Sequence, residues 1–124
     1  MRGKQYLTRS ADFDRVYRQK ASWASKRLVL RAASQETGAD SDMSRYGFSI
    51  SKRVGGAVVR NRLRRRLREI MRRLPLKSGW DIVFIVRQPA AEAHFSELRE
   101  DVEKLLARAR LLGEKNEVYC LKAD

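Results

Sequence analysis

The 124-residue sequence predicts one α+β domain, an α/β sandwich with the element order α-β-β-(β)-α-β-α, the strand in parentheses being optional. The length fits a single domain, and a hydrophobic content of 43% is enough for one core. Apolar residues recur with a helical period in some segments, whereas others are rich in β-branched and aromatic residues. We expect one domain over residues 1–124 with an ordered core of about 6–112.

The first predicted element is a short amphipathic helix over residues 11–19. Ser10 is a suitable N-cap, and acidic side chains follow in the first turn. Phe13, Val16 and Tyr17 recur at the spacing of one helical face. This face is predicted to pack against the rest of the domain.

Two strands are predicted next, over residues 23–33 and 45–52, joined by an acidic loop at 34–44. The first segment is rich in β-branched and aromatic residues. In the second, apolar side chains alternate with small ones, which indicates one buried face. The alternating apolar residues are Tyr46, Phe48 and Ile50.

A long amphipathic helix is predicted over residues 57–74, between the Gly55–Gly56 turn and Pro75. Its apolar residues fall on one face and most of its arginines on the other. The sequence therefore places the apolar stripe against the core and the arginines in solvent. The apolar stripe comprises Val59, Leu63, Leu67, Ile70 and Leu74.

The C-terminal part is predicted to add a buried strand over 80–87 and a helix over 96–112. Ser96 is the expected cap of that helix, and Gly113 is expected to end it. Residues 114–124 are expected to form a short tail, in which 116–121 is either an extra strand or loosely packed chain.

The net charge of +13 makes a polyanion the expected partner. The 22 residues 52–73 hold ten cations and one acid, so this segment carries +9 of the total. Nine of the ten cations are arginine, which suits bidentate phosphate contact and stacking on bases. Two alternatives to a nucleic-acid partner are a solvated helix face without a partner and capture of this helix by an acidic protein or membrane surface.

Several function classes lack support in the sequence. With one Cys and one His, the chain has neither a disulfide framework nor a His/Cys zinc cluster. The carboxylates are scattered rather than spaced as metal ligands, and neither a P-loop nor a GxGxxG motif occurs. His94 is expected to be a surface or capping residue, and Cys120 a packing residue. No targeting segment or membrane span is apparent, and the single Cys fits a reduced setting, so we expect a cytoplasmic protein with no membrane partner. We also expect no small-molecule substrate.

The segment Ser51–Glu69 resembles the signature of the bacterial ribonuclease P protein component. A basic pair ends a strand, a glycine turn follows, and Arg60-Asn61-Arg62 opens an arginine-rich helix. Phe13 on an early helix and the Gly47-Phe48-Ser49 strand also match, so the resemblance covers roughly residues 6–112.

The resemblance implies a fold and a function. The fold is a sandwich with a left-handed βαβ crossover, opposite to the usual hand. The protein would be the non-catalytic subunit of a ribonucleoprotein endonuclease that removes the 5′ leader of precursor tRNA. Its partners would be the catalytic RNA and the leader. Mg²⁺ would be held mainly by the RNA, and the protein would raise substrate affinity and lower the Mg²⁺ demand.

The resemblance also implies two RNA-binding surfaces. Arg64 stands where lysine is frequent in the family, so the charge is kept. The expected leader cleft lies between the first helix and the sheet, where aromatic rings suit unpaired bases. The alternative to leader binding is that Phe13 and Tyr17 are simply core residues on the apolar face of the helix. Residues implied to contact the catalytic RNA are Lys52, Arg53, Arg60, Asn61, Arg62, Arg64, Arg65 and Arg68. Those implied to line the leader cleft are Phe13, Tyr17, Lys26, Leu28 and Leu30.

Three rival functions are weighed against this one. The first is a small ribosomal or assembly protein that binds RNA without a processing role. The second is a self-sufficient nuclease, which would depend on an acid such as Asp81. The third, DNA recognition by the arginine helix, is weaker because sequence-specific DNA readers usually mix Asn, Gln and Ser with Arg.

Overall fold

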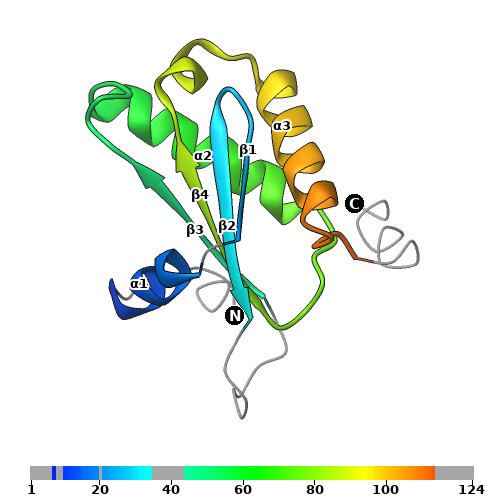
Figure 1. Cartoon of the computed structure of the whole chain (residues 1–124). Helices are drawn as coiled ribbons and strands as arrows, with labels where there is room; N and C mark the ends of the chain where they lie inside the picture. The colour runs from blue at the N-terminus through cyan, green and yellow to red at the C-terminus, as the bar shows by residue number, and fades with distance from the viewer. Residues whose placement is uncertain (1–6, 8–9, 20, 35–43, 114–124) are drawn as a thin grey trace.

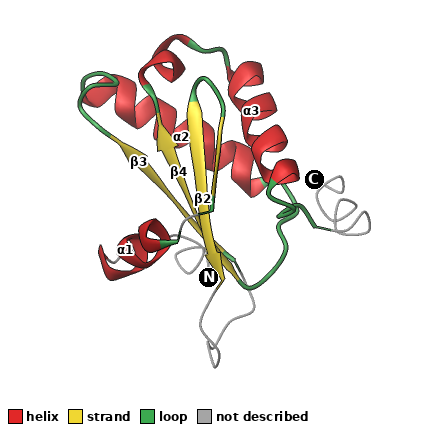
Figure 2. Ribbon diagram, in the orientation of Figure 1, coloured by secondary structure: helices red, strands yellow, loops and turns green. Residues whose placement is uncertain are grey.

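A four-stranded sheet forms the centre of the computed structural model, with helices on both faces (Figures 1 and 2). The structure describes residues 7, 10–19, 21–34 and 44–113. Most of the predicted acidic loop and the whole predicted tail, with Cys120, lie outside these residues. The elements are α1 (Ser10–Arg18), β1 (Ser22–Ala24), β2 (Leu28–Ser34), β3 (Arg45–Ile50), α2 (Ala57–Arg72), β4 (Trp80–Val86), the short 3₁₀ helix η2 (Gln88–Glu92) and α3 (Phe95–Arg108).

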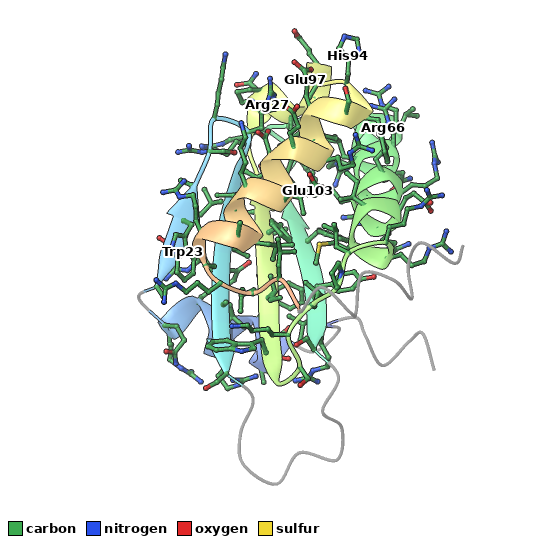
Figure 3. All side chains as sticks on the ribbon, turned by 90° about the vertical axis from the view of Figure 1, so that its right-hand side faces the viewer. Trp23, Arg27, Arg66, His94, Glu97 and Glu103 are labelled. Atoms are coloured by element: carbon green, nitrogen blue, oxygen red, sulfur yellow. The ribbon has the colours of Figure 1, made fainter. Side chains whose placement is uncertain are left out.

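The sheet has the strand order β1-β2-β4-β3, in which β3 and β4 are parallel and the other pairs antiparallel. The predicted α+β fold is confirmed, and the element order is consistent with the prediction. In Figure 1 both parallel strands run upward, β3 lies to the left of β4, and α2 passes behind the sheet. The turned view in Figure 3 agrees on the position of α2. A connection that moves to the right behind the sheet is left-handed, as the family resemblance implied.

The main core lies between the sheet and the helices α2 and α3. On β2 and β4 every second residue faces this side, including Leu28, Leu30 and Phe84, which are fully buried. Burying one such side chain stabilises the fold by about 1.5–3 kcal/mol. The predicted apolar stripe of α2 is confirmed in its centre. Val59 near its start is only partly buried, and Leu74, also partly buried, lies beyond the helix, which ends at Arg72 and not at 74. The buried residues of α2 are Leu63, Leu67, Ile70 and Met71.

A smaller apolar cluster lies on the opposite face, beneath α1. Val16 of α1 is fully buried there with Val83 of β4, and Ala33 of β2 and Leu7 join them. Because adjacent residues of a strand point to opposite faces, this cluster and the main core use alternate positions of β2 and β4. The sheet therefore separates α1 from α2 and α3.

The segment 23–33 forms two strands rather than the single predicted one. A tight turn over residues 25–27 separates them, in which the Ser25 backbone N–H donates to the Leu28 carbonyl at 2.8 Å. The Ser25 hydroxyl oxygen accepts from the backbone N–H groups of Arg27 and Leu28. A serine hydroxyl can thus close a turn that lacks glycine and proline.

Both ends of α3 differ from the prediction. The cap is His94 and not Ser96, which lies within the helix, and the His94 backbone N–H donates to the Glu97 carboxylate at 2.8 Å. Gly113 does not end the helix. Arg110 adopts a left-handed backbone conformation (φ 61°), and the Leu111 N–H donates to the Leu106 carbonyl at 2.9 Å. This is a Schellman motif with arginine where glycine is common.

Candidate nucleic-acid interface

The basic surface is built on the turn after β3 and the outer face of α2. The turn requires glycine at position 55, because a Cβ there would lie 2.8 Å from the Cβ of Val59. Burial of Leu63 and Leu67 fixes the rotation of α2 about its axis, so the arginines between them point away from the core. The local sequence thus converts a charge run into a one-sided surface.

The predicted RNA-contacting residues divide by exposure. Arg60 is half-buried and donates from Nε to the Gly55 carbonyl at 3.2 Å, so it braces the turn. Arg64 is half-buried and donates to Oδ1 of Asn61 at 3.2 Å. Arg62 is the third half-buried member. The exposed members are Lys52, Arg53, Asn61, Arg65 and Arg68.

Arg62 and Arg66 lie on the edge of α2 that faces the segment between β4 and α3. Arg62 donates to the Ala91 carbonyl at 3.2 Å, and Arg66 donates to the Ala93 carbonyl at 3.4 Å. Figure 3 shows Arg66 on the side of α2 that faces the start of α3. These two arginines therefore connect α2 to the η2 region. The sequence alone could not distinguish this structural role from contact with RNA.

The C-terminal end of α2 carries less free charge than its start. The Glu69 carboxylate accepts hydrogen bonds from Arg72 and Arg73, each at 2.6 Å. Such exposed pairs contribute little stability, but they partly neutralise the charge at this end. The positive surface is therefore strongest over residues 52–68.

A second candidate surface lies where α1 meets the other face of the sheet. The rings of Phe13 and Tyr17 are half-buried, with centroids 6.3 Å apart and tilted by 49°. The pairing register aligns Val29 of β2 and Ser49 of β3 with Ile85 of β4, and all three are half-buried on this face. An aromatic pair thus lies next to a partly exposed sheet surface.

Two of the residues predicted to line the leader cleft lie on the other face of the sheet. Leu28 and Leu30 are fully buried in the main core on the opposite face, so they do not line the α1 side. A shift of one residue along a strand changes the face. The same strand presents Val29 and Arg31 to α1, and the sequence reasoning missed both. Lys26 lies exposed in the turn between β1 and β2.

That turn is held to α3 by ion pairs. Arg27 donates to Asp101 at 2.9 Å and to Glu97 at 3.2 Å (Figure 3 labels Arg27 and Glu97). The hydrogen bond to Asp101 is the main reason why the pKa of Arg27 is raised. The pKa of Glu97 is lowered, chiefly by the backbone N–H of His94 and further by Arg27. These pairs position the β1–β2 turn, and with it Lys26.

Asp81 is fully buried on the α1 face and forms ion pairs with Arg15 and Arg45. Its position between two guanidinium groups indicates a structural role rather than a metal ligand. Within the described part of the chain, no three His, Cys, Asp or Glu side chains are grouped so as to hold a metal ion. In the same part, none of the helices is long and apolar enough to cross a membrane.

Comparisons with known proteins give a consistent result. A family model described as Ribonuclease P matches residues 1–110. The ribonuclease P protein component of Dehalococcoides mccartyi (strain ATCC BAA-2266 / KCTC 15142 / 195) is 40% identical over 124 residues, covering 100% of both chains. That of Roseiflexus castenholzii is 47% identical over 100 residues, covering 78% of this chain and 79% of the relative.

Solved structures agree with these relatives. The Staphylococcus aureus RNase P protein superposes with a TM-score of 0.77 at 29% identity, covering 88% of this chain and 98% of the other. The Thermotoga maritima RNase P protein gives a TM-score of 0.70 at 29% identity, covering 83% and 96%.

Proposed function

Since the chain belongs to the ribonuclease P protein family, which acts as a subunit in tRNA 5′ processing, we propose that it binds both the catalytic RNA and the precursor tRNA leader. The observation that carries this proposal is the division of the molecule by its sheet. An exposed cationic surface lies on one side, and an accessible aromatic pair lies on the other.

The catalytic RNA would bind the surface made by the turn after β3 and the outer face of α2. Exposed Lys52, Arg53 and Arg65 are free of the carbonyl contacts that engage Arg62 and Arg66. Phosphate contacts by such residues release condensed counterions, which makes affinity salt-dependent. Neutralising crowded phosphates would also lower the Mg²⁺ that the RNA needs to fold and act.

The single-stranded leader would bind beside α1. Phe13 and Tyr17 offer ring faces to unpaired bases, and such stacking is worth about 1–3 kcal/mol per base with little sequence preference. Val29, Ser49 and Ile85 would form the floor of this site in place of Leu28 and Leu30. The leader adds affinity only for the precursor, which would favour release of mature tRNA.

The phosphodiester hydrolysis would belong to the RNA, and Mg²⁺ would be held mainly by its phosphates. Over the described residues the protein offers no cluster of metal ligands, and its buried carboxylate, Asp81, is paired with arginines. The protein would therefore bind and orient the two RNAs without itself supplying the reacting group.

Reconstitution tests this function. The protein is mixed with ribonuclease P RNA and precursor tRNA at low Mg²⁺, and 5′ cleavage is measured with and without protein. We expect strong stimulation at low Mg²⁺ that decreases as Mg²⁺ is raised. The protein without the RNA should not cleave the precursor. Absence of stimulation, or cleavage by the protein alone, would refute the proposal.

A further inference from the structure

Phe13 is in contact with the backbone of β3 at Gly47. A Cβ at this glycine would lie 2.7 Å from Cζ and 3.1 Å from Cε1 of the Phe13 ring, and 3.2 Å from the Cβ of Leu7. Among the described glycines only Gly79 has a positive φ, so the strand backbone at position 47 would accept alanine. The absence of a side chain at Gly47 therefore leaves room chiefly for the Phe13 ring, and also for Leu7, rather than meeting a backbone need of the strand.

Tyr17 is held by Arg31 of β2. Nη2 of Arg31 donates to the carbonyls of Tyr17 at 2.9 Å and Gln19 at 2.6 Å, groups that the end of α1 leaves without helical partners. Cζ of Arg31 also lies 6.0 Å from the centroid of the Tyr17 ring, within cation–π range. One guanidinium thus fixes both the backbone and the ring at this position.

Helix α1 cannot fix these rings unaided. It has nine residues, too few for a stable isolated helix, and Val16 is the only fully buried one among its described side chains. Its rings therefore take their positions from the sheet. A ring that is already ordered loses less conformational entropy when a base stacks on it, so rigid placement raises affinity.

We propose that Gly47 and Arg31 are positioning residues that preorganise Phe13 and Tyr17 as a rigid stacking surface for the leader. This inference rests on the proposed leader binding and deepens it. Neither residue needs to touch RNA, since each acts through the ring it holds.

The test for Gly47 is a double-mutant cycle. Gly47→Ala, Phe13→Ala and the double variant are assembled with ribonuclease P RNA, and affinities for leader-bearing and leaderless tRNA are compared. We expect Gly47→Ala to reduce the leader-dependent gain in affinity about fivefold, the equivalent of the smallest stacking contribution. In the Phe13→Ala background the same change should have no further effect. An equal effect in both backgrounds would overturn the role.

The test for Arg31 uses Arg31→Lys, which keeps the charge but removes the planar, multidentate donor. Arg99→Lys is the matched control, because Arg99 is exposed on α3 across the sheet. We expect Arg31→Lys to lower the leader-dependent gain about fivefold, and the control to leave it unchanged. Unfolding curves of each variant separate this effect from loss of folded protein.

The outcomes separate this inference from the function on which it rests. If Phe13→Ala and Tyr17→Ala reduce the leader-dependent gain while Gly47→Ala and Arg31→Lys do not, leader binding stands and the positioning roles fail. If Phe13→Ala and Tyr17→Ala leave the gain unchanged, both proposals fail.

Discussion

Arg45 on β3 donates two hydrogen bonds to Asp81 on β4, from Nε at 2.9 Å and from Nη2 at 2.7 Å. Asp81 also pairs with Arg15, so this carboxylate joins α1 to two strands. We expect Asp81→Asn to lower the free energy of unfolding by about 3 kcal/mol. This is the lower end for breaking a buried pair, because both arginines keep some exposed surface. Urea unfolding measures it, with exposed Glu100→Gln as the control. Equal stability of wild type and Asp81→Asn would contradict the structural role.

Arg65 and Arg62 should respond differently to replacement, although both belong to the arginine run. Arg65 is exposed, so Arg65→Ala should reduce the slope of log affinity against log salt by roughly 0.7–0.9 if it contacts one phosphate. The unfolding free energy of Arg65→Ala should equal that of the wild type. Arg62→Ala should lower the unfolding free energy by about 1–2 kcal/mol, because it loses a charged hydrogen bond to Ala91. Salt titrations and urea unfolding test the pair, and the reverse pattern would refute the division.

Phe13 and Leu30 allow the two faces of the sheet to be compared. Phe13→Ala should weaken binding of the leader-bearing precursor more than that of mature tRNA. Leu30→Ala creates a cavity in the main core and should cost about 2–5 kcal/mol of stability. Measured on folded protein, it should leave the precursor-to-mature ratio unchanged. A fall in this ratio for Leu30→Ala would restore the original assignment of Leu30 to the cleft.

Arg110 offers a stabilising substitution. Its positive φ of 61° is unfavourable for a residue with a Cβ, whereas glycine adopts it freely. We expect Arg110→Gly to raise the free energy of unfolding by about 0.5–1 kcal/mol, since the Schellman hydrogen bonds are kept. Thermal or urea unfolding checks this. Destabilisation would show that the arginine side chain contributes more than the strain costs.

Glu97 predicts a pH dependence. Its folded-state pKa is lowered below the ordinary 4.5, so its contribution to stability is present above that pH and is lost as the pH falls through the folded value. Glu97→Gln should therefore be less stable than wild type at neutral pH, with the difference shrinking below pH 4.5. Unfolding free energies measured from neutral pH down to acid test this. A constant difference across that range would exclude the carboxylate as its source.

The sequence predicts α2 and its exposed arginines well because one face of that helix is apolar throughout. It could not assign the faces of β2, because Leu28, Val29 and Leu30 are all apolar and give no alternation. The hydrophobic pattern also cannot distinguish Arg62, bonded to a carbonyl across a gap of 29 residues, from exposed Arg65. These distinctions depend on tertiary contacts.

The hand of the crossover and the cap of α3 were equally inaccessible to pattern. Both hands use the same strands and helix, so only the family resemblance indicated the rarer one. Ser96 has the better capping side chain, but Glu97 reaches back to His94 and starts the helix earlier. The structure thus departs from two general preferences, for right-handed crossovers and for serine at helix caps.

The continuous path from β3 into α2 sets a fixed distance between the two proposed RNA contacts. Gly47 lies beneath Phe13, and Lys52 follows five residues later in the turn that leads to α2. At about 3.3 Å per extended residue, at most roughly 16 Å of chain separates them. The protein would thus act as a molecular ruler between the leader and the catalytic RNA. Inserting one residue into β3 would change that spacing and would also reverse the faces of the strand residues on one side of the insertion, because side chains alternate along a strand.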